Sequence, residues 1–128
     1  MDQMEEEFLE IDKKEEDLKA VKKEVARLNK LFKKLPQNKF KLAQGLIQQA
    51  ARLRVRLDRL WVDIVETGET ELFSQSDKTE PYERERPSAR LFTATDKNYQ
   101  SVMKQLFDLL PPEETEVDEL AEFLKHNE

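Results

Sequence analysis

The sequence predicts an all-α fold: a long antiparallel helical hairpin, preceded by an N-terminal helix and followed by a short C-terminal helix. Three observations predict it. Only two glycines and five prolines occur in 128 residues, which suits long helices and argues against an all-β chain. Apolar residues recur at helical spacings of three and four in three long segments. With 38% hydrophobic and 39% charged residues, a monomer would have a thin core, so we expect the apolar stripes to be buried between subunits.

The first expected helix runs from about residue 4 to 35. Its narrow stripe has the two-position pattern of a coiled coil or bundle arm, and it consists of Leu18, Val21, Val25, Leu28, Phe32 and Leu35. Lys14 interrupts the continuation of this stripe towards Ile11, which leaves residues 1–17 free to fray. Pro36 ends the helix, because its ring clashes with a helical residue before it.

The second expected helix runs from about residue 38 to 67, with Asn38 as its N-cap and Gly68 as the left-handed residue after its last turn. Its apolar stripe is broad and consists of Ala43, Leu46, Ile47, Ala50, Leu53, Leu57, Leu60, Trp61 and Ile64. Gly45 lies inside this helix at a cost of about 1 kcal/mol relative to alanine. Close packing of a neighbouring backbone would account for a glycine there.

The tip of the hairpin is expected to be extended, because residues 70–75 alternate enough for a short strand or arm. Residues 76–87 are polar and rich in turn formers. The third helix is expected from Pro87 or Ser88 to about residue 110, with a stripe of Leu91, Phe92, Tyr99, Val102, Met103, Leu106, Leu109 and Leu110. Pro111 and Pro112 end it, and Thr115 and Asp118 have the spacing of a capping box for a last helix. We therefore distinguish an N-terminal helical arm (1–35), a central hairpin that is the oligomerisation core (36–112) and an acidic tail helix (113–128).

Charge is segregated along the chain. Residues 18–59 carry thirteen lysines and arginines against two acidic residues, a net charge of +11. Residues 1–17 carry −7, residues 60–110 carry −4 and residues 111–128 carry −6, which brings the whole chain to −6. A basic block attracts phosphate or acidic partners, whereas acidic ends repel nucleic acid and favour basic partners, including other copies of the chain.

The basic block supplies the candidate DNA-binding residues. On a helical wheel, one side of the second helix, opposite its apolar stripe, carries Lys41, Arg52, Arg56 and Arg59. Four cations on one face of a rigid rod can follow a phosphate backbone. Further lysines surround the Pro36 corner, so the predicted set is Lys30, Lys33, Lys34, Lys39, Lys41, Arg52, Arg56 and Arg59.

The same charge pattern fits a solvated face that pairs with acidic residues equally well. Arg59 and Asp63 lie four residues apart and could pair within the helix. Arg54 lies at the edge of the apolar stripe, where we expect it to meet a carboxylate at an interface.

No enzyme site and no metal or other cofactor is expected. The chain lacks a phosphate-binding glycine loop, its single histidine, His126, lies in the tail, and its carboxylates form no spaced set around an apolar pocket. Trp61 and Tyr99 are interpreted as core residues. The absence of cysteine fits an intracellular setting, and with no long apolar run and an acidic N-terminus we expect neither a membrane segment nor a secretory signal.

The segment from Leu60 to Pro112 carries a recognisable pattern. It reads W-V-D-I-V-E-T-G-E-T-E-L-F-S-Q, then a polar stretch, then Y-E-R-E-R-P-S-A-R-L-F-T-A-T-D-K-N-Y-Q-S-V-M-K-Q-L-F-D-L-L-P-P. A long helix ends in Gly68, an extended segment follows, and the next helix opens with Pro87-Ser88-Ala89 and closes at Leu109-Leu110-Pro111. Over about residues 36–112, this pattern resembles the small subunit of phage terminase, in the short helical form of tailed phages and prophages of Gram-positive bacteria.

The resemblance implies a non-enzymatic viral DNA-packaging factor in the host cytoplasm. Such subunits form homo-oligomeric rings, bind double-stranded genome DNA, and recruit the terminase large subunit, which holds the ATPase and nuclease. Their C-terminal segment commonly contacts the large subunit, so the expected partner-binding residues are Val117, Leu120, Phe123 and Leu124. A tail helix that caps its own hairpin is the other interpretation.

The N-terminal segment departs from the family pattern. Many members of the family carry an N-terminal helix-turn-helix, whereas residues 1–35 read as a single helix. The basic block is therefore the candidate DNA contact on charge alone. The alternative function is a helical interaction module that oligomerises through coiled-coil-like contacts and does not bind nucleic acid.

Overall fold

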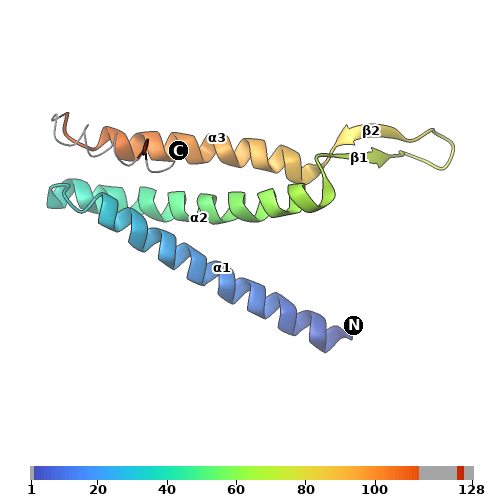
Figure 1. Ribbon diagram of the computed structural model, residues 1–128, viewed down its shortest axis with the longest axis horizontal. Helices are drawn as coiled ribbons and strands as arrows, with labels where there is room; N and C mark the ends of the chain where they lie inside the picture. The colour runs from blue at the N-terminus through green and yellow to red at the C-terminus, as the bar shows by residue number, and fades with distance from the viewer. Residues whose placement is uncertain (1, 113–123, 126–128) are drawn as a thin grey trace.

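The computed structural model, which describes residues 2–112 and 124–125, confirms the mostly helical fold. Its elements, in chain order, are α1 (Gln3–Leu31), α2 (Gln37–Thr67), β1 (Thr70–Phe73), β2 (Tyr82–Glu85) and α3 (Pro87–Asp108). Figure 1 shows α2 and α3 lying antiparallel side by side, with the two strands extending beyond one end of this hairpin. From the opposite end, α1 diverges from α2 towards its own N-terminus.

The ends of α1 differ from those expected. Asp2 caps the helix, because its Oδ1 accepts a hydrogen bond of 2.9 Å from the backbone N–H of Glu5, and the helix continues through residues 3–17. At the other end, α1 stops at Leu31 instead of residue 35. Residues 32–35 form a turn, in which the N–H of Leu35 donates to the carbonyl oxygen of Phe32 at 3.2 Å. The turn is consistent with the following Pro36, since a proline disfavours helical backbone at the residue before it.

The two ends of α2 show one wrong prediction and one confirmed one. Pro36 occupies the N-cap position and no side chain caps the helix, so the prediction that Asn38 is the N-cap is wrong. At the other end, Gly68 has a φ of 88°, which suits a residue without a Cβ, and its N–H donates to Ile64 at 2.8 Å. The close packing expected at Gly45 is not found: a Cβ there would meet nothing within 4 Å.

The two strands form an antiparallel ribbon. The second strand, β2, was not predicted from the sequence. The register pairs Thr70 with Glu85 and runs to Phe73 opposite Tyr82. Residues 82–85 read Y-E-R-E and show no apolar alternation, so their pattern gave no strand signal. Pairs across the ribbon supply the stabilisation: Arg84 forms an ion pair of 2.8 Å with Glu71, and its guanidinium carbon lies 3.4 Å from the ring centroid of Phe73.

The core lies where all three helices meet, at the end of the hairpin opposite the ribbon. Its buried side chains are Leu28, Phe32, Leu35, Ala43, Ile47, Ala50, Val102 and Leu106. The ring of Phe32 is completely buried and lies 5.9 Å from that of Phe107. Trp61, by contrast, is 54% exposed and touches Phe92 at the ribbon end, so its assignment to the core is wrong. In the described part of the chain, no helix combines the length and apolar character needed to cross a membrane.

Candidate nucleic-acid interface

The fold gathers the cations of α1 and α2 around one corner. No aspartate or glutamate occurs between Val25 and Leu57. The turn at Pro36 folds this segment back on itself, so the end of α1 and the start of α2 lie together (Figure 1). A segment without carboxylates that is doubled back in this way produces a positive field on its solvent side.

Six of the eight predicted DNA-binding residues are exposed on this corner and along α2: Lys30, Lys33, Lys34, Lys41, Arg52 and Arg56. Of these, all except Lys34 lack an ion pair with any residue in the described ranges. Their charge is therefore available to an external anion without first breaking a contact within the molecule.

The remaining two predicted residues make tertiary contacts. Lys39 is half-buried, and its Nζ donates to the carbonyl oxygen of Leu109 at 3.4 Å, just beyond the end of α3. Arg59 reaches α1, where its Nη1 lies 3.0 Å from Asp17. The predicted pairing of Arg59 with Asp63 is wrong, because Asp63 instead lies 3.7 Å from Arg86.

Two other arginines of the basic block stabilise the helices themselves. The Nη2 of Arg54 lies 2.7 Å from Asp58, and its guanidinium carbon lies 5.2 Å from the ring centroid of Tyr99. Burial lowers the pKa of Arg54, but hydrogen bonding and charge interactions with Asp58 and Tyr99 together outweigh it and leave the pKa above the ordinary value. The carboxylate expected for Arg54 thus comes from its own helix. The hydrogen bond of Arg27 to Glu24, at 2.6 Å, likewise raises the pKa of Arg27.

Arg52 and Arg56 border a groove of about 390 Å³ between α2 and α3. We call it the α2–α3 groove; it is lined by Gln49, Arg52, Leu53, Arg56, Asn98, Ser101 and Val102. Leu53 is half-buried and Val102 is buried, so these two side chains give the groove an apolar floor.

Two lysines on α3 add to the positive charge beside this groove. Lys97 and Lys104 are exposed and lie four residues before and three residues after Ser101, which places them on the same face of α3. Neither lysine was among the predicted DNA-binding residues, because both lie in a segment of net charge −4. Their spacing around Ser101 is the signal that could have identified them, once that residue is known to line the groove.

Of the predicted acidic tail helix, the structure describes only residues 124–125. Val117, Leu120 and Phe123 of the predicted partner-binding set lie outside the described residues. Leu124 is described, and its side chain is 56% exposed. Across the described ranges, no three histidine, cysteine, aspartate or glutamate side chains come together as they would around a metal ion.

Comparisons of the chain with protein-family models, with curated proteins and with solved structures find no match. The terminase resemblance therefore stays a prediction that depends on the sequence pattern of residues 60–112.

Proposed function

We propose that this protein is a non-enzymatic viral DNA-packaging factor that binds double-stranded DNA through the corner of α1 and α2 and along the exposed side of α2. In this proposal it acts in the host cytoplasm as a ring-shaped homo-oligomer, and it recruits and regulates the terminase large subunit. The observation that carries the proposal is the acid-free segment from Val25 to Leu57, which presents five exposed cations without ion pairs to described residues.

The character of these cations favours contacts with phosphate over contacts with bases. Lysine and arginine on rigid helices neutralise phosphates independently of sequence. A base-stacking platform would need exposed aromatic rings, but Phe32 is buried and Phe40 is half-buried at this corner. We therefore expect binding that depends strongly on salt and weakly on DNA sequence.

Self-association is supported by apolar side chains that the single chain leaves exposed on its hairpin. Trp61, Val62 and Val65 lie within four residues of one another near the ribbon end of α2 and are 54%, 55% and 64% exposed. Neighbouring exposed apolar side chains of this kind are typical of an interaction site. The recruitment of the large subunit is supported by the terminase resemblance alone.

The DNA-binding proposal is tested by a charge-matched pair of double variants. Lys33→Ala with Lys41→Ala removes two corner cations, whereas Lys13→Ala with Lys14→Ala removes two exposed lysines from the acidic part of α1. Duplex affinity is measured by fluorescence anisotropy over a range of salt concentrations. If both lysines contact phosphates, the corner variant loses affinity and its log–log salt slope becomes shallower by about 2.

The control variant should keep the slope of the parent protein. An absence of duplex binding even at low salt would overturn the proposal. Equal slopes for the corner variant and the parent would remove Lys33 and Lys41 from the interface.

The second candidate function is the helical interaction module that does not bind nucleic acid. The exposure of Phe8 and Leu18 on α1, each 63%, favours it, because such side chains suit a protein partner. Such a module would still oligomerise, but it would show no salt-dependent duplex affinity in the anisotropy experiment.

A further inference from the structure

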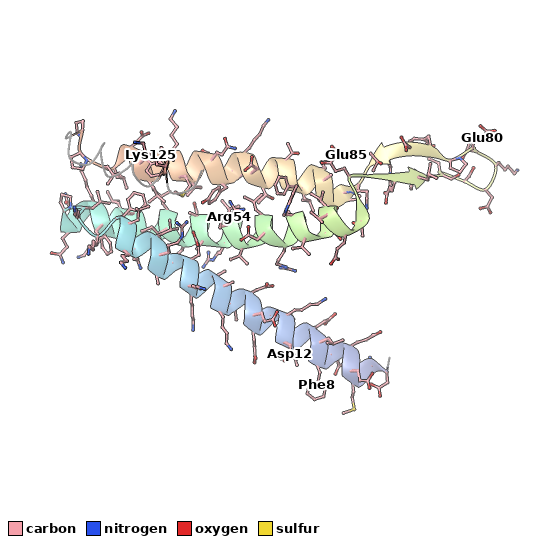
Figure 2. All side chains as sticks on the ribbon, viewed as in Figure 1. Phe8, Asp12, Arg54, Glu80, Glu85 and Lys125 are labelled. Atoms are coloured by element: carbon pink, nitrogen blue, oxygen red, sulfur yellow. The ribbon has the colours of Figure 1, made fainter. Side chains whose placement is uncertain are left out.

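The N-terminal half of α1 exposes an apolar stripe that its own hairpin does not cover. The stripe has spacings of four, three and seven residues, and all its members are more than half exposed: Met4, Phe8, Ile11 and Leu18. A different side of the helix, with Lys13, Glu16 and Asp17, lines the space towards α2. Figure 2 accordingly shows Phe8 pointing away from the hairpin.

The charge of this part of α1 limits what can cover the stripe. Residues 1–17 carry nine acidic and two basic side chains. Pairing two such arms would bring two segments of −7 together, which like-charge repulsion disfavours. The complementary surface is therefore basic at its edges and apolar at its centre.

The α2–α3 groove has both properties. Arg52 and Arg56 border it without ion pairs to described residues, and Leu53 and Val102 form its apolar floor. A groove between two antiparallel helices can also accept the side-chain ridge of a third helix.

The arm of the same chain cannot reach this groove. α1 lies along the side of α2 that carries Arg54, Val55 and Asp58. The groove floor at Leu53 lies on another side of α2, about 160° around the helix from Val55, and Arg59, which reaches Asp17 of α1, lies at the border between the two sides. An arm that occupies the groove must therefore come from another molecule.

We infer that residues 3–18 of one copy dock in the α2–α3 groove of a second copy. Phe8 and Ile11 lie against the apolar floor, and the carboxylates of the arm lie beside Arg52 and Arg56. Each copy then donates one arm and offers one groove, which is a head-to-tail contact that can close into a ring.

A consequence follows for DNA binding, and this consequence rests on the proposed function. If Arg52 and Arg56 also contact phosphates, a docked arm and a bound duplex compete for the same two side chains. DNA binding should then release the arms, whereas the arm contact itself does not depend on DNA.

The absence of cysteine from the chain allows a direct test by disulfide trapping. The full-length variants Phe8→Cys and Ser101→Cys, carrying tags of different mass, are mixed without DNA under mild oxidation. The control mixture combines Phe8→Cys with Glu80→Cys, an exposed site at the tip of the ribbon (Figure 2). We expect the groove pair to form the mixed disulfide roughly tenfold faster than the control pair, because docking raises the effective concentration of the two thiols.

Equal rates for the two mixtures, or a predominance of Phe8→Cys homodimers, would overturn the arm contact. The double variant Phe8→Ser with Ile11→Ser provides an independent measurement. Both side chains are exposed, so helix content by circular dichroism should stay unchanged while the native mass of the oligomer falls. An unchanged native mass would also count against the contact.

Adding duplex DNA to the trapping mixture tests the competition separately. We expect the yield of the groove disulfide to fall as the duplex saturates the protein. An unchanged yield with bound DNA would overturn the competition. Failure of trapping in a protein that still binds duplex would refute only the arm contact, and trapping in a protein that binds no duplex would refute only the proposed function.

Discussion

Arg59 of α2 and Asp17 of α1 form an ion pair of 3.0 Å that joins the diverging half of α1 to the hairpin. The Arg59 side chain is 65% exposed and that of Asp17 is 33% exposed, so water screens the pair and it stabilises the fold by less than about 1 kcal/mol. Its larger effect is on charge, because the carboxylate neutralises a cation on the side of α2 that was predicted to contact DNA.

The variant Asp17→Asn should therefore strengthen duplex binding. It releases Arg59 to contact a phosphate, which would steepen the log–log salt slope by about 1. The free energy of unfolding should change by less than about 1 kcal/mol. The measurements are anisotropy titrations at several salt concentrations and urea unfolding.

Asp12→Asn is the matched control, since it removes the same charge from an exposed residue of α1 that forms no ion pair with the described part of the hairpin. It should change the affinity less than Asp17→Asn does. Equal effects of the two variants would mean that only the overall charge of the arm matters.

The helices could be predicted from sequence because their signals are local. Apolar spacing placed all three, and Gly68 ended α2 at the expected residue because only a residue without a Cβ adopts its φ easily. The prediction of Asn38 as the N-cap was wrong because the helix begins earlier, with Pro36 in the N-cap position. β2 could not be found from its own residues, since Arg84 and Tyr82 are stabilised by partners across the ribbon.

The charged residues of the candidate site could be predicted from the sequence, but the residues that they contact in the fold could not. A helical wheel places Arg52, Arg56 and Arg59 on one side of α2. It does not show that Arg59 meets Asp17, nor that Lys39 reaches Leu109, because both contacts join elements distant in sequence. Lys97 and Lys104 could not be predicted for the same reason. They become candidates only because α3 packs beside α2 and forms a groove with it.

Gly45→Ala should stabilise the protein. Alanine is better than glycine within a helix by about 1 kcal/mol, and the added Cβ meets nothing within 4 Å. Urea unfolding at fixed protein concentration should show a higher midpoint. Gly68→Ala provides the contrast: a Cβ also has space there, but the φ of 88° strains an L residue by about 1–3 kcal/mol. A destabilising Gly45→Ala would indicate that this surface is packed in the oligomer.

Phe32→Ala should destabilise the protein strongly. The ring is completely buried where the three helices meet and touches Phe107, so its loss leaves a cavity that costs about 3–5 kcal/mol. A loss of this size is a large part of the stability of a small domain. Leu42→Ala is the control, because Leu42 is 70% exposed and should change the stability of the single chain by less than about 0.5 kcal/mol. Similar unfolding midpoints for the two variants would contradict this description of the core.

Arg84→Ala should loosen the ribbon without unfolding the hairpin. The guanidinium both pairs with Glu71 at 2.8 Å and lies over the ring of Phe73, so its removal deletes two contacts that hold β1 against β2. Hydrogen exchange of residues 70–85 should become faster, while exchange in the buried part of α2 stays unchanged, because the ribbon lies outside the core. Lys78→Ala, in the exposed turn between the strands, removes a positive charge without either contact and should leave exchange in both regions at the parent rate. Faster exchange throughout α2 in Arg84→Ala would show instead that the ribbon and the hairpin unfold as one cooperative unit.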